Sequence, residues 1–348
     1  MKSKIDGIGI KAISVAVPFK VIKLEEYIDY KTPEDLKRAF HKTGIDSLRY
    51  AKDTTTTSDL CEQASLKLFD AGYSKNDIGA IVFGSKTPDY IMPSTSCCLQ
   101  GKMGLSKDVL CYDYNGGCCG YLYGLQLSSM LAKLHNTNVL LLTGDTNSKL
   151  VSRRDFTSVS LFGDGGSATI VGPEENNHLS FHIKNDGTRY DTIIVPAGAF
   201  RNPRTEDNSR EIERDNGNYR SECNTEMKGA TTMNFILNEA VDLLSDTIKK
   251  SEKPIDWYFF HQANKFIIKS LVACLKLPED KVPIVVNGYG NTSSCTIPLG
   301  ICGSDFRDHK NENNNFSMLA AFGVGLSWGT ILTDLSNSDI LSVAEVDL

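Results

Sequence analysis

The sequence has no apolar run long enough to cross a membrane. A spanning helix needs about 20 predominantly apolar residues, and polar or charged residues interrupt every apolar stretch before that length. The opening segment, MKSKIDGIGI, lacks the apolar core of a secretory signal peptide and is typical of a first β-strand instead. We therefore expect no membrane partner.

The sequence also lacks a dense run of lysine and arginine. Its 348 residues include 37 Lys and Arg against 43 Asp and Glu, a formal net charge of −6. Proteins that bind nucleic acid concentrate positive charge on one face or in one segment. We therefore expect no nucleic-acid partner, and the length allows two domains or one duplicated domain.

Paired cysteine knuckles are missing as well. No Cys-x-x-Cys pairs of a structural zinc site occur, so we expect no metal, and we expect no other cofactor. A long chain without secretory features favours reduced thiols and a cytoplasmic location over a disulfide framework. The ten cysteines are at positions 61, 97, 98, 111, 118, 119, 223, 274, 295 and 302.

Strand-like and helix-like segments alternate along the first half of the chain. Residues 8–17, 78–84 and 139–144 are apolar runs typical of strands, and residues 60–69 have the spacing of a helix. This alternation predicts a layered α/β fold with a mostly parallel sheet that is buried on both faces.

One cysteine pair occupies a special position. Residues 113–121, DYNGGCCGY, follow an apolar strand and precede a helix predicted over about 121–134. A thiol at a helix N-terminus experiences the positive end of the helix dipole, which favours the nucleophilic thiolate. The alternative is a buried thiol that acts as a small hydrophobic residue. We expect Cys118 to be a nucleophile.

The sequence contains an internal repeat. Residues 161–171 and 321–332 both pass through a glycine turn into a strand, and residues 77–84 match 254–261. The cysteine segment matches 284–294, which we expect to form a strand, a glycine turn and a helix. Matched segments in the same order predict a duplicated domain with halves 1–175 and 176–348, which meet at the polar run 173–178.

If the halves are symmetric, equivalent turns converge on one cleft. Cys118 and Asn291 lie at matching turns, and His261 ends a strand, where open α/β sheets bind ligands. A thiolate can hold an acyl group as a thioester, and imidazole and amide groups can stabilise an enolate. The Cys118 N–H and an N–H of the turn after Phe322 could form an oxyanion hole. A lone histidine or a Gly-Asn dipeptide more often has only a structural role.

These residues carry a resemblance to a known family. The segments GCCGY at 117–121, HQAN at 261–264, GNTS at 290–293 and FGVGLSWG at 322–329 resemble the motifs of β-ketoacyl-acyl-carrier-protein synthase III in the thiolase superfamily. The resemblance implies duplicated βαβαβ halves that form a layered α/β/α/β/α sandwich, a homodimer, and a Cys–His–Asn site.

The resemblance also implies roles for individual residues. Cys118 matches the acylated nucleophile, and His261 and Asn291 match the pair that promotes malonyl decarboxylation and stabilises the carbanion. Val324 matches the second N–H of the oxyanion hole, beside that of Cys118. For the acyl pocket, Met92 matches the residue that reaches the partner subunit's pocket, and Met233 and Phe235 lie near the apolar position beside the cysteine.

The chain departs from the family pattern at the surface that would bind coenzyme A. Arg38 stands where a tryptophan is common, while Phe266 and Phe156 stand where arginines are typical. The resemblance therefore implies altered coenzyme A recognition. The basic residues that we expect to meet coenzyme A or an acidic carrier protein are Arg38, Lys42, Arg153 and Lys265.

Two polar segments fit no regular element. Residues 199–222 are rich in charge and asparagine and have no apolar periodicity, which predicts a long surface loop. We interpret it as an inert insertion rather than a lid or an acceptor-binding segment. Residues 311–315, NENNN, are predicted to form a solvated turn.

Three functions remain open from the sequence. The favoured one is a condensing enzyme that loads an acyl group from acyl-CoA or an acyl carrier protein on Cys118 and condenses it with malonyl carrier protein. The second is an acyltransferase of the same fold that uses an alcohol or amine acceptor, with His261 as general base. The third is a non-catalytic partner subunit, and the presence of Cys118, His261 and Asn291 argues against it.

Overall fold

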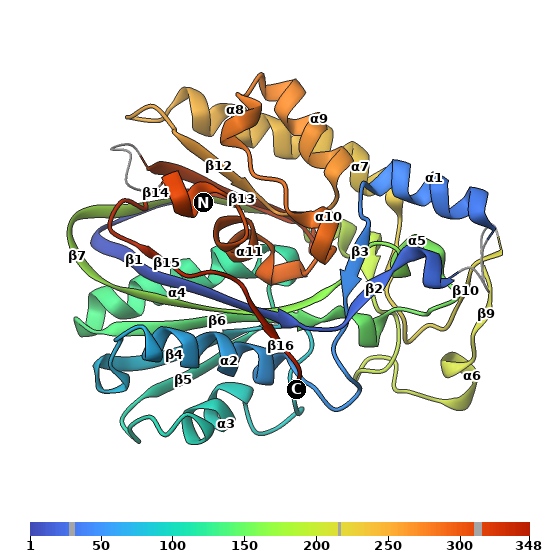
Figure 1. Ribbon diagram of the computed structural model, residues 1–348, viewed down its shortest axis with the longest axis horizontal. Helices are drawn as coiled ribbons and strands as arrows, with labels where there is room; N and C mark the ends of the chain where they lie inside the picture. The colour runs from blue at the N-terminus through green and yellow to red at the C-terminus, as the bar shows by residue number, and fades with distance from the viewer. Residues whose placement is uncertain (28–31, 215–216, 310–314) are drawn as a thin grey trace.

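The computed structural model describes residues 1–27, 32–214, 217–309 and 315–348, and it is built of five layers. Figure 1 shows outer helices at the top, a sheet, a central pair of helices, a second sheet, and outer helices at the bottom. The layered α/β/α/β/α sandwich predicted from the sequence is confirmed.

The first half forms the lower layers. Its sheet has the order β5-β4-β6-β7-β1, and α4 covers the inner face. The elements are β1 (Lys2–Pro18), β2 (Val21–Lys23), α1 (Pro33–Thr43), β3 (Ser47–Arg49), α2 (Thr57–Asp70), β4 (Ile78–Gly84), α3 (Thr95–Lys102), β5 (Leu110–Tyr114), α4 (Gly120–His135), β6 (Asn138–Thr146), α5 (Phe156–Val159) and β7 (Asp164–Asn185).

The second half repeats this order in the upper layers. Strands β12, β13 and β14 lie as β4, β6 and β7 do, and the end of β7 pairs with β14 as β1 pairs with β7 in the first half. The elements are β8 (Ile193–Ile194), α6 (Glu206–Ser209), β9 (Ile212–Glu213), β10 (Tyr219–Arg220), β11 (Glu226–Met227), α7 (Gly229–Phe235), α8 (Val241–Lys249), β12 (Trp257–Phe260), α9 (Lys265–Leu275), α10 (Val286–Tyr289), α11 (Thr296–Cys302), α12 (Phe306–His309), β13 (Phe316–Gly323), β14 (Ser327–Asp334), β15 (Asp339–Ile340) and β16 (Ala344–Val346).

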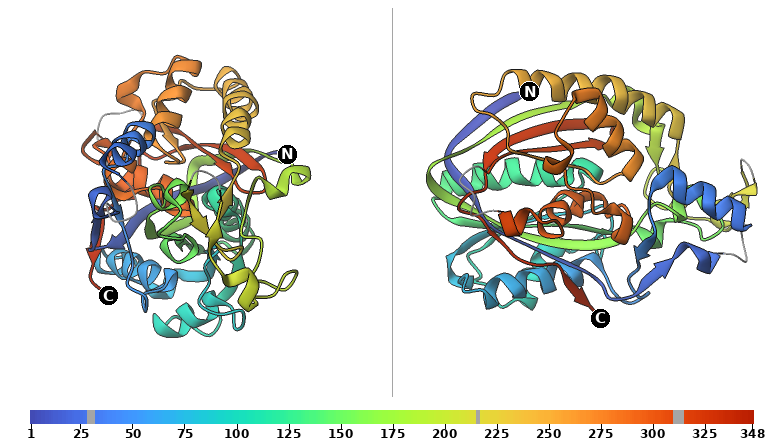
Figure 2. Two further views of the ribbon diagram at one scale, coloured as in Figure 1. Left: turned by 90° about the vertical axis from the view of Figure 1, so that its right-hand side faces the viewer. Right: turned by 45° about the horizontal axis from the view of Figure 1, so that its top comes forward.

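Two long strands join the halves. β1 and β7 pair antiparallel from Lys2↔His182 to Ala16↔Gly166, and the register shifts twice along the way. Figure 2 shows both strands curving around the central helices from one sheet to the other. The domain boundary near residue 175 stays a prediction, and in the structure the residues on both sides of it belong to the single strand β7.

The sheet is mixed, so the expectation of a mostly parallel sheet was wrong. The pairs β4–β5, β4–β6, β12–β13, β1–β15 and β1–β16 are parallel, whereas the longer pairings β6–β7, β1–β7 and β13–β14, together with β7–β14, are antiparallel. The short turn 324–326 joins β13 to β14, and a connection of that length can only join antiparallel neighbours.

The strand expected at the start of 284–294 is also absent from the structure. Residues 286–289 form the short helix α10, and the predicted helix follows as α11. The side chain of Gln262 replaces a strand partner here. Its Oε1 accepts from the Val285 N–H at 3.0 Å and its Nε2 donates to the Pro283 carbonyl at 3.1 Å. With both groups satisfied by an amide side chain, the segment needs no neighbouring strand.

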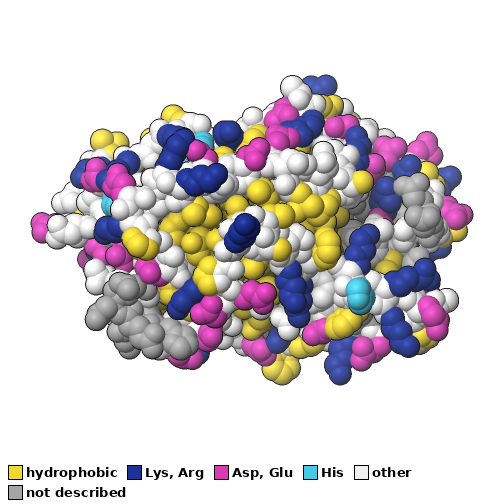
Figure 3. All heavy atoms as spheres, turned by 90° about the horizontal axis from the view of Figure 1, so that it is seen from above, with side chains coloured by type: hydrophobic (Ala, Val, Ile, Leu, Met, Phe, Trp, Pro, Cys, Tyr) yellow, Lys and Arg dark blue, Asp and Glu magenta, His cyan; other side chains and the backbone are white. Residues whose placement is uncertain are grey.

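The core surrounds the central helices. α4 contacts strands of both sheets, and its residues Tyr121, Leu122 and Leu125 are fully buried. A second cluster lies between the upper sheet and α8 and α9. Figure 3 looks down on these outer helices and shows hydrophobic side chains along the middle of the face with charged residues around them. Partly buried members of this cluster include Ile248, Leu275 and Leu277.

All ten cysteines are free thiols in the structure. Across the described residues, no helix combines the length and the apolar character that a membrane crossing requires. The asparagine-rich turn predicted at 311–315 lies outside the described residues except for its last position.

A glycine at the contact of α2 with β7 tests the packing of the lower layer. A Cβ at Gly166 would lie 2.7 Å from the backbone nitrogen of Cys61 and 2.8 Å from the carbonyl carbon of Leu60. We expect Gly166→Ala to lower the free energy of unfolding by about 2 kcal/mol, because the helix must move away from the strand. Urea denaturation measures this loss. Gly187→Ala, where a Cβ meets nothing within 4 Å, is the control and should change stability by less than about 0.5 kcal/mol.

Candidate active site

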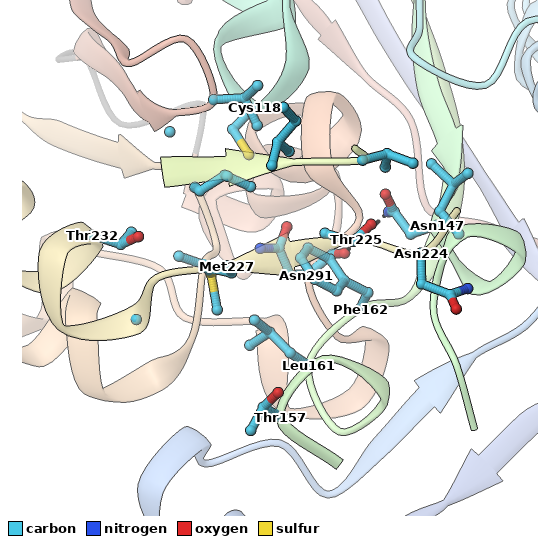
Figure 4. Close-up of a pocket in the computed structure, with 18 of the residues that line it drawn as sticks. Cys118, Asn147, Thr157, Leu161, Phe162, Asn224, Thr225, Met227, Thr232 and Asn291 are labelled. Carbon is cyan, nitrogen blue, oxygen red and sulfur yellow. Dashed lines mark hydrogen bonds between the residues drawn. The ribbon is translucent and has the colours of Figure 1, made fainter. Parts of the chain in front are cut away.

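Cys118 lies at the turn between β5 and α4. It belongs to a 3₁₀ turn, Gly117–Cys119, that leads directly into α4, so its thiol is at the N-terminal end of a long helix as predicted. The residue is only 8% exposed and lines a cavity of about 1260 Å³. Figure 4 shows the sulfur pointing into this cavity, on the side where Asn291 lies.

The two adjacent cysteines face different surroundings. Cys119 is buried, and its Sγ donates to the Ser327 carbonyl at 3.2 Å. Burial raises the pKa of the Cys119 thiol well above its ordinary value. Cys119 therefore packs α4 against β14, and Cys118 is the member of the pair that faces the cavity.

Val324 brings the second half against this turn. It lies between β13 and β14, and its backbone N–H lowers the pKa of the Cys118 thiol. Two glycines permit the approach: a Cβ at Gly323 would lie 2.7 Å from the Cys118 Cβ, and one at Gly117 would lie 2.9 Å from the Val324 Cβ. The structure thus brings the turn that carries Val324 directly against the turn that carries Cys118.

His261 directly follows β12 and is 1% exposed. Its Nδ1 lies 2.6 Å from the Thr296 hydroxyl oxygen, and that hydroxyl donates to the Ser293 carbonyl at 2.8 Å. Because a hydroxyl has one proton to donate, Nδ1–H must be the donor to Thr296. This bond fixes the orientation of the ring. Nε2 is the nitrogen that does not bond to Thr296.

Asn291 is held between the two halves. Its N–H donates to the Leu161 carbonyl at 2.8 Å, and its own carbonyl accepts from the Gly163 N–H at 3.1 Å. The side-chain Oδ1 accepts from the Ser293 N–H at 2.9 Å. Since Oδ1 is occupied, the amide presents its Nδ2–H donors to the cavity.

The segment His261–Asn264 divides its tasks among its residues. Gln262 bonds to the backbone of Phe260 and of the 283–285 segment, and Asn264 caps α9 by accepting from the Ile267 N–H at 2.8 Å. The Gln262 amide is fully used in these backbone bonds, whereas the neighbouring His261 lines the cavity. The motif thus combines a helix cap at Asn264, a backbone clamp at Gln262 and a ring at His261 that lines the cavity.

Comparison with known proteins agrees with this geometry. The family model described as 3-oxoacyl-[acyl-carrier-protein] synthase III matches residues 112–187, and its C-terminal counterpart matches residues 246–335. A 3-oxoacyl-[acyl-carrier-protein] synthase 3 homologue of Campylobacter jejuni is 31% identical over 98% of both chains. The β-ketoacyl-[acyl-carrier-protein] synthase III of Fusobacterium nucleatum is 32% identical over 94% of this chain and 98% of its own.

A solved structure shows the same likeness. The 3-oxoacyl-(acyl-carrier protein) synthase of Burkholderia xenovorans superimposes with a TM-score of 0.92 at 31% identity and covers 99% of both chains. The chain belongs to the 3-oxoacyl-[acyl-carrier-protein] synthase III family. It is therefore a thiolase-like condensing enzyme of the acyltransferase class, as its motifs indicated.

The structure separates the residues that the synthase III resemblance assigned to the acyl pocket. Met233 lines the cavity. Phe235 does not: it is fully buried and packs edge-on against Trp328 with ring centroids 5.2 Å apart. The assignment of Phe235 to the pocket wall is corrected, because this last residue of α7 points into the upper core. Met92 is 82% exposed and lies outside the cavity wall of its own chain.

The basic residues divide in the same way. Arg38 and Lys42 of α1 line the cavity, and Arg38 pairs with Asp35 at 3.0 Å. Arg153 is exposed and Lys265 packs its stem against Gly44, so neither reaches the cavity wall.

The segment 199–222 also differs from expectation. It contains short elements rather than a continuous loop, and Arg204, Asn218 and Arg220 line the cavity. Arg220 is anchored to Asp155 at 3.3 Å. The interpretation as an inert insertion was wrong, because the segment folds back over α5 and builds part of the cavity wall.

Sequence reasoning missed Lys86 and Thr296. Lys86 follows β4 and lines the cavity with Cys118. Its position just beyond the carboxyl end of a predicted strand was a usable signal, since ligand sites occur there. Thr296 gave no signal, because its role depends on a contact with His261, which lies 35 residues away in the sequence.

Burial determines the charge states of the two reactive side chains. It raises the pKa of the Cys118 thiol, and this effect is opposed by the Lys86 charge, the Val324 N–H and the Ser293 hydroxyl. Burial, aided by the Lys86 charge, lowers the pKa of His261 to about 3. The imidazole is therefore neutral near pH 7.

The buried neutral imidazole makes stability depend on pH. Below its ordinary pKa of 6.5, the unfolded chain binds a proton at His261 that the folded protein, with a pKa of about 3, does not bind. Stability is therefore lost as the pH falls, and the ring accounts for about 2 kcal/mol between pH 7.5 and pH 5. Urea denaturation of the native protein and of His261→Gln at both pH values measures this term as the difference between their pH dependences. Equal pH dependences would contradict it.

Proposed function

We propose that Cys118, His261 and Asn291 catalyse the decarboxylative condensation of an acyl thioester with a malonyl thioester. The observation that carries the proposal is that all three side chains line one cavity, although they come from different halves. The Val324 N–H beside the Cys118 sulfur adds the second donor of an oxyanion hole. An inert partner subunit would not need this set.

The first step transfers the acyl group to the enzyme. The Cys118 thiolate attacks the thioester carbonyl carbon, and the backbone N–H groups of Cys118 and Val324 stabilise the oxyanion. The carbon–sulfur bond of the donor breaks as the new one forms. The departing thiolate takes a proton from solvent.

The second step forms the carbon–carbon bond. The malonyl thioester loses carbon dioxide, and the electron pair of the broken bond becomes an enolate that attacks the acyl carbon on Cys118. Asn291 Nδ2–H donates to the enolate oxygen. The bound malonyl carboxylate and the developing enolate raise the low pKa of the nearby His261, so Nε2 takes up a proton, donates a second hydrogen bond, and finally protonates the released Cys118 thiolate.

Intact-protein mass spectrometry tests both steps. We expect acetyl-, butyryl- or octanoyl-thioesters to add one acyl mass to the protein, and malonyl carrier protein to remove that mass with release of carbon dioxide. Cys118→Ala should gain no acyl mass. Asn291→Ala should be acylated normally but lose about 100-fold in the rate of the second step, because it lacks an enolate donor.

Two other outcomes of this experiment would overturn the proposal. An adduct that malonyl thioesters leave in place, but that an alcohol or amine removes, would establish the acyltransferase alternative. That alternative draws support from the polar segment 199–222, which lines the cavity. No adduct with any donor, despite a reactive thiol, would favour the non-catalytic subunit.

We further propose acyl-CoA or an acyl carrier protein as the donor and malonyl carrier protein as the second substrate. Relatives such as that of Fusobacterium nucleatum carry the carrier protein in their names. Arg38 and Lys42 place positive charge at the cavity wall, where it suits a phosphate-bearing thioester arm or an acidic carrier surface. We also place the protein in the cytoplasm, because reducing compartments keep thiols free and all ten cysteines are free.

We propose that the protein is a homodimer that pairs through β5. This strand ends the sheet and exposes Leu110 and Tyr112 at 39% and 41%. Tyr90, Ile91 and Met92 are 61%, 82% and 82% exposed. An apolar edge strand is a template for pairing with a second chain. In such a dimer Met92 would meet the partner subunit, as the resemblance implies.

Introducing charges on this apolar surface tests the dimer. We expect Tyr112→Lys and Ile91→Asp to shift the mass measured by light scattering from two chains toward one, because a charge would be buried at the interface. Phe266→Lys replaces another exposed apolar residue, 53% exposed, at the start of α9, on the opposite outer layer (Figure 1). This control should leave the mass unchanged, and a native protein with the mass of one chain would refute the proposal.

A further inference from the structure

Lys86 places a positive charge in the wall of the catalytic cavity. It follows β4, and its side chain is 19% exposed. Its Nζ donates to the Ser293 hydroxyl oxygen at 2.8 Å and lies 3.9 Å from Asp145 Oδ2. The same ammonium lies 5.9 Å from the centre of the Phe162 ring. The condensing mechanism described above gives this lysine no task.

Ser293 connects the lysine to the nucleophile. Its hydroxyl accepts from Lys86 Nζ at 2.8 Å and lowers the pKa of the Cys118 thiol. A hydroxyl that accepts from an ammonium can direct its single proton to sulfur. Ser293 adopts a φ of +56°, a left-handed conformation that is uncommon outside glycine. Ser293 therefore connects the two residues: its Oγ accepts from Lys86 Nζ, and its hydroxyl lowers the pKa of the Cys118 thiol.

Asp145 lies beside Lys86, but its carboxylate is already hydrogen-bonded to other groups. The carboxylate is fully buried, and Oδ1 accepts from the Ser85 hydroxyl at 3.1 Å and from the Lys86 N–H at 2.8 Å. Oδ2 accepts from the Ser294 hydroxyl at 3.0 Å. These donors already satisfy the carboxylate, and the lysine Nζ lies 1.1 Å closer to Ser293 (2.8 Å) than to Asp145 (3.9 Å).

The groups around Cys118 act in opposite directions. Lys86 and the two hydrogen bonds from Val324 and Ser293 lower the pKa of the thiol, whereas burial and the Asp145 charge raise it. Of the other titratable neighbours, His261 is neutral near pH 7 and Cys119 is a buried thiol with a raised pKa. Lys86 is therefore the one positive charge among these groups that face the sulfur.

We propose that Lys86, acting through Ser293, is a positioning residue that stabilises the thiolate of Cys118 and makes its ionisation independent of His261. The thiol proton leaves to solvent, and the negative sulfur is held by the Ser293 hydroxyl and the lysine charge. His261 is thereby kept for the proton that the malonyl step takes up. The inference deepens the proposed function, on which the role of Cys118 rests.

The pH dependence of Cys118 alkylation tests this role without any thioester. Iodoacetamide is allowed to react at pH 6 to 10, and peptide mass spectrometry follows Cys118 separately from the exposed Cys97 and Cys274. We expect Lys86→Met to move the midpoint up by about one pH unit and to slow alkylation at pH 7 by about tenfold, because the nearest positive charge is gone. Ser293→Ala should shift it in the same direction.

Three further variants separate this role from a structural one. Lys86→Arg keeps the charge and should restore the native midpoint, and His261→Ala should leave the midpoint in place. Lys149 is a matched control: it lines the same cavity, but its Nζ donates to the Asp53 and Thr55 carbonyls, so Lys149→Met should not shift the midpoint.

Two results would overturn the inference. One is a Lys86→Met profile that coincides with the native profile, and the other is a His261→Ala shift as large as that of Lys86→Met. Failure of the proposed function looks different, because a native alkylation profile would then accompany the absence of any acyl adduct or of malonyl-dependent turnover.

Discussion

The approach of two glycine turns, one from each half, is the constraint on which the site depends. The turn that carries Cys118 and the turn that carries Val324 lie so close that a single Cβ at Gly117 or Gly323 would occupy the space of the other turn. This contact brings the Val324 turn against the residue that carries the thiol. It also buries Cys118, and burial is the largest influence on the pKa of its thiol.

Burial opposes charge on both Cys118 and His261, and Lys86 affects the two residues in opposite directions. A buried thiol resists ionisation and a buried imidazole resists protonation. Lys86 favours the first charge and opposes the second. It therefore offsets part of the rise that burial causes in the pKa of the thiol, and it helps to keep the imidazole neutral.

Much of the fold was predictable because several of its strands are apolar and buried on both faces. The segment 78–84 was predicted to the residue, and the duplication was visible in matched glycine turns. Cys118, His261 and Asn291 could be picked out as candidates because each lies in a short motif, and the structure places all three on one cavity. The failures have a common cause in contacts between distant residues. The strand expected near residue 284 was replaced by the Gln262 clamp, and the direction of β7 depended on its pairing with β6 and β14.

Contacts between residues distant in the sequence also explain why part of the site was not predicted. Phe235 has the right composition for a pocket wall, but the direction of its side chain is set by packing against Trp328. Thr296 and Lys86 act through partners 35 and 207 residues away in the sequence. No local pattern encodes such pairs, whereas a cap such as Asn264 is local to its helix.

The two strands that cross between the sheets have a consequence for how the molecule comes apart. Because β1 and β7 each belong to both sheets, neither sheet can lose its edge without stripping hydrogen bonds from the other. A half-unfolded molecule would leave a long stretch of β7 without a neighbour, and such an exposed ladder is costly. The two halves should therefore melt as a single cooperative unit, although each has its own set of strands and helices.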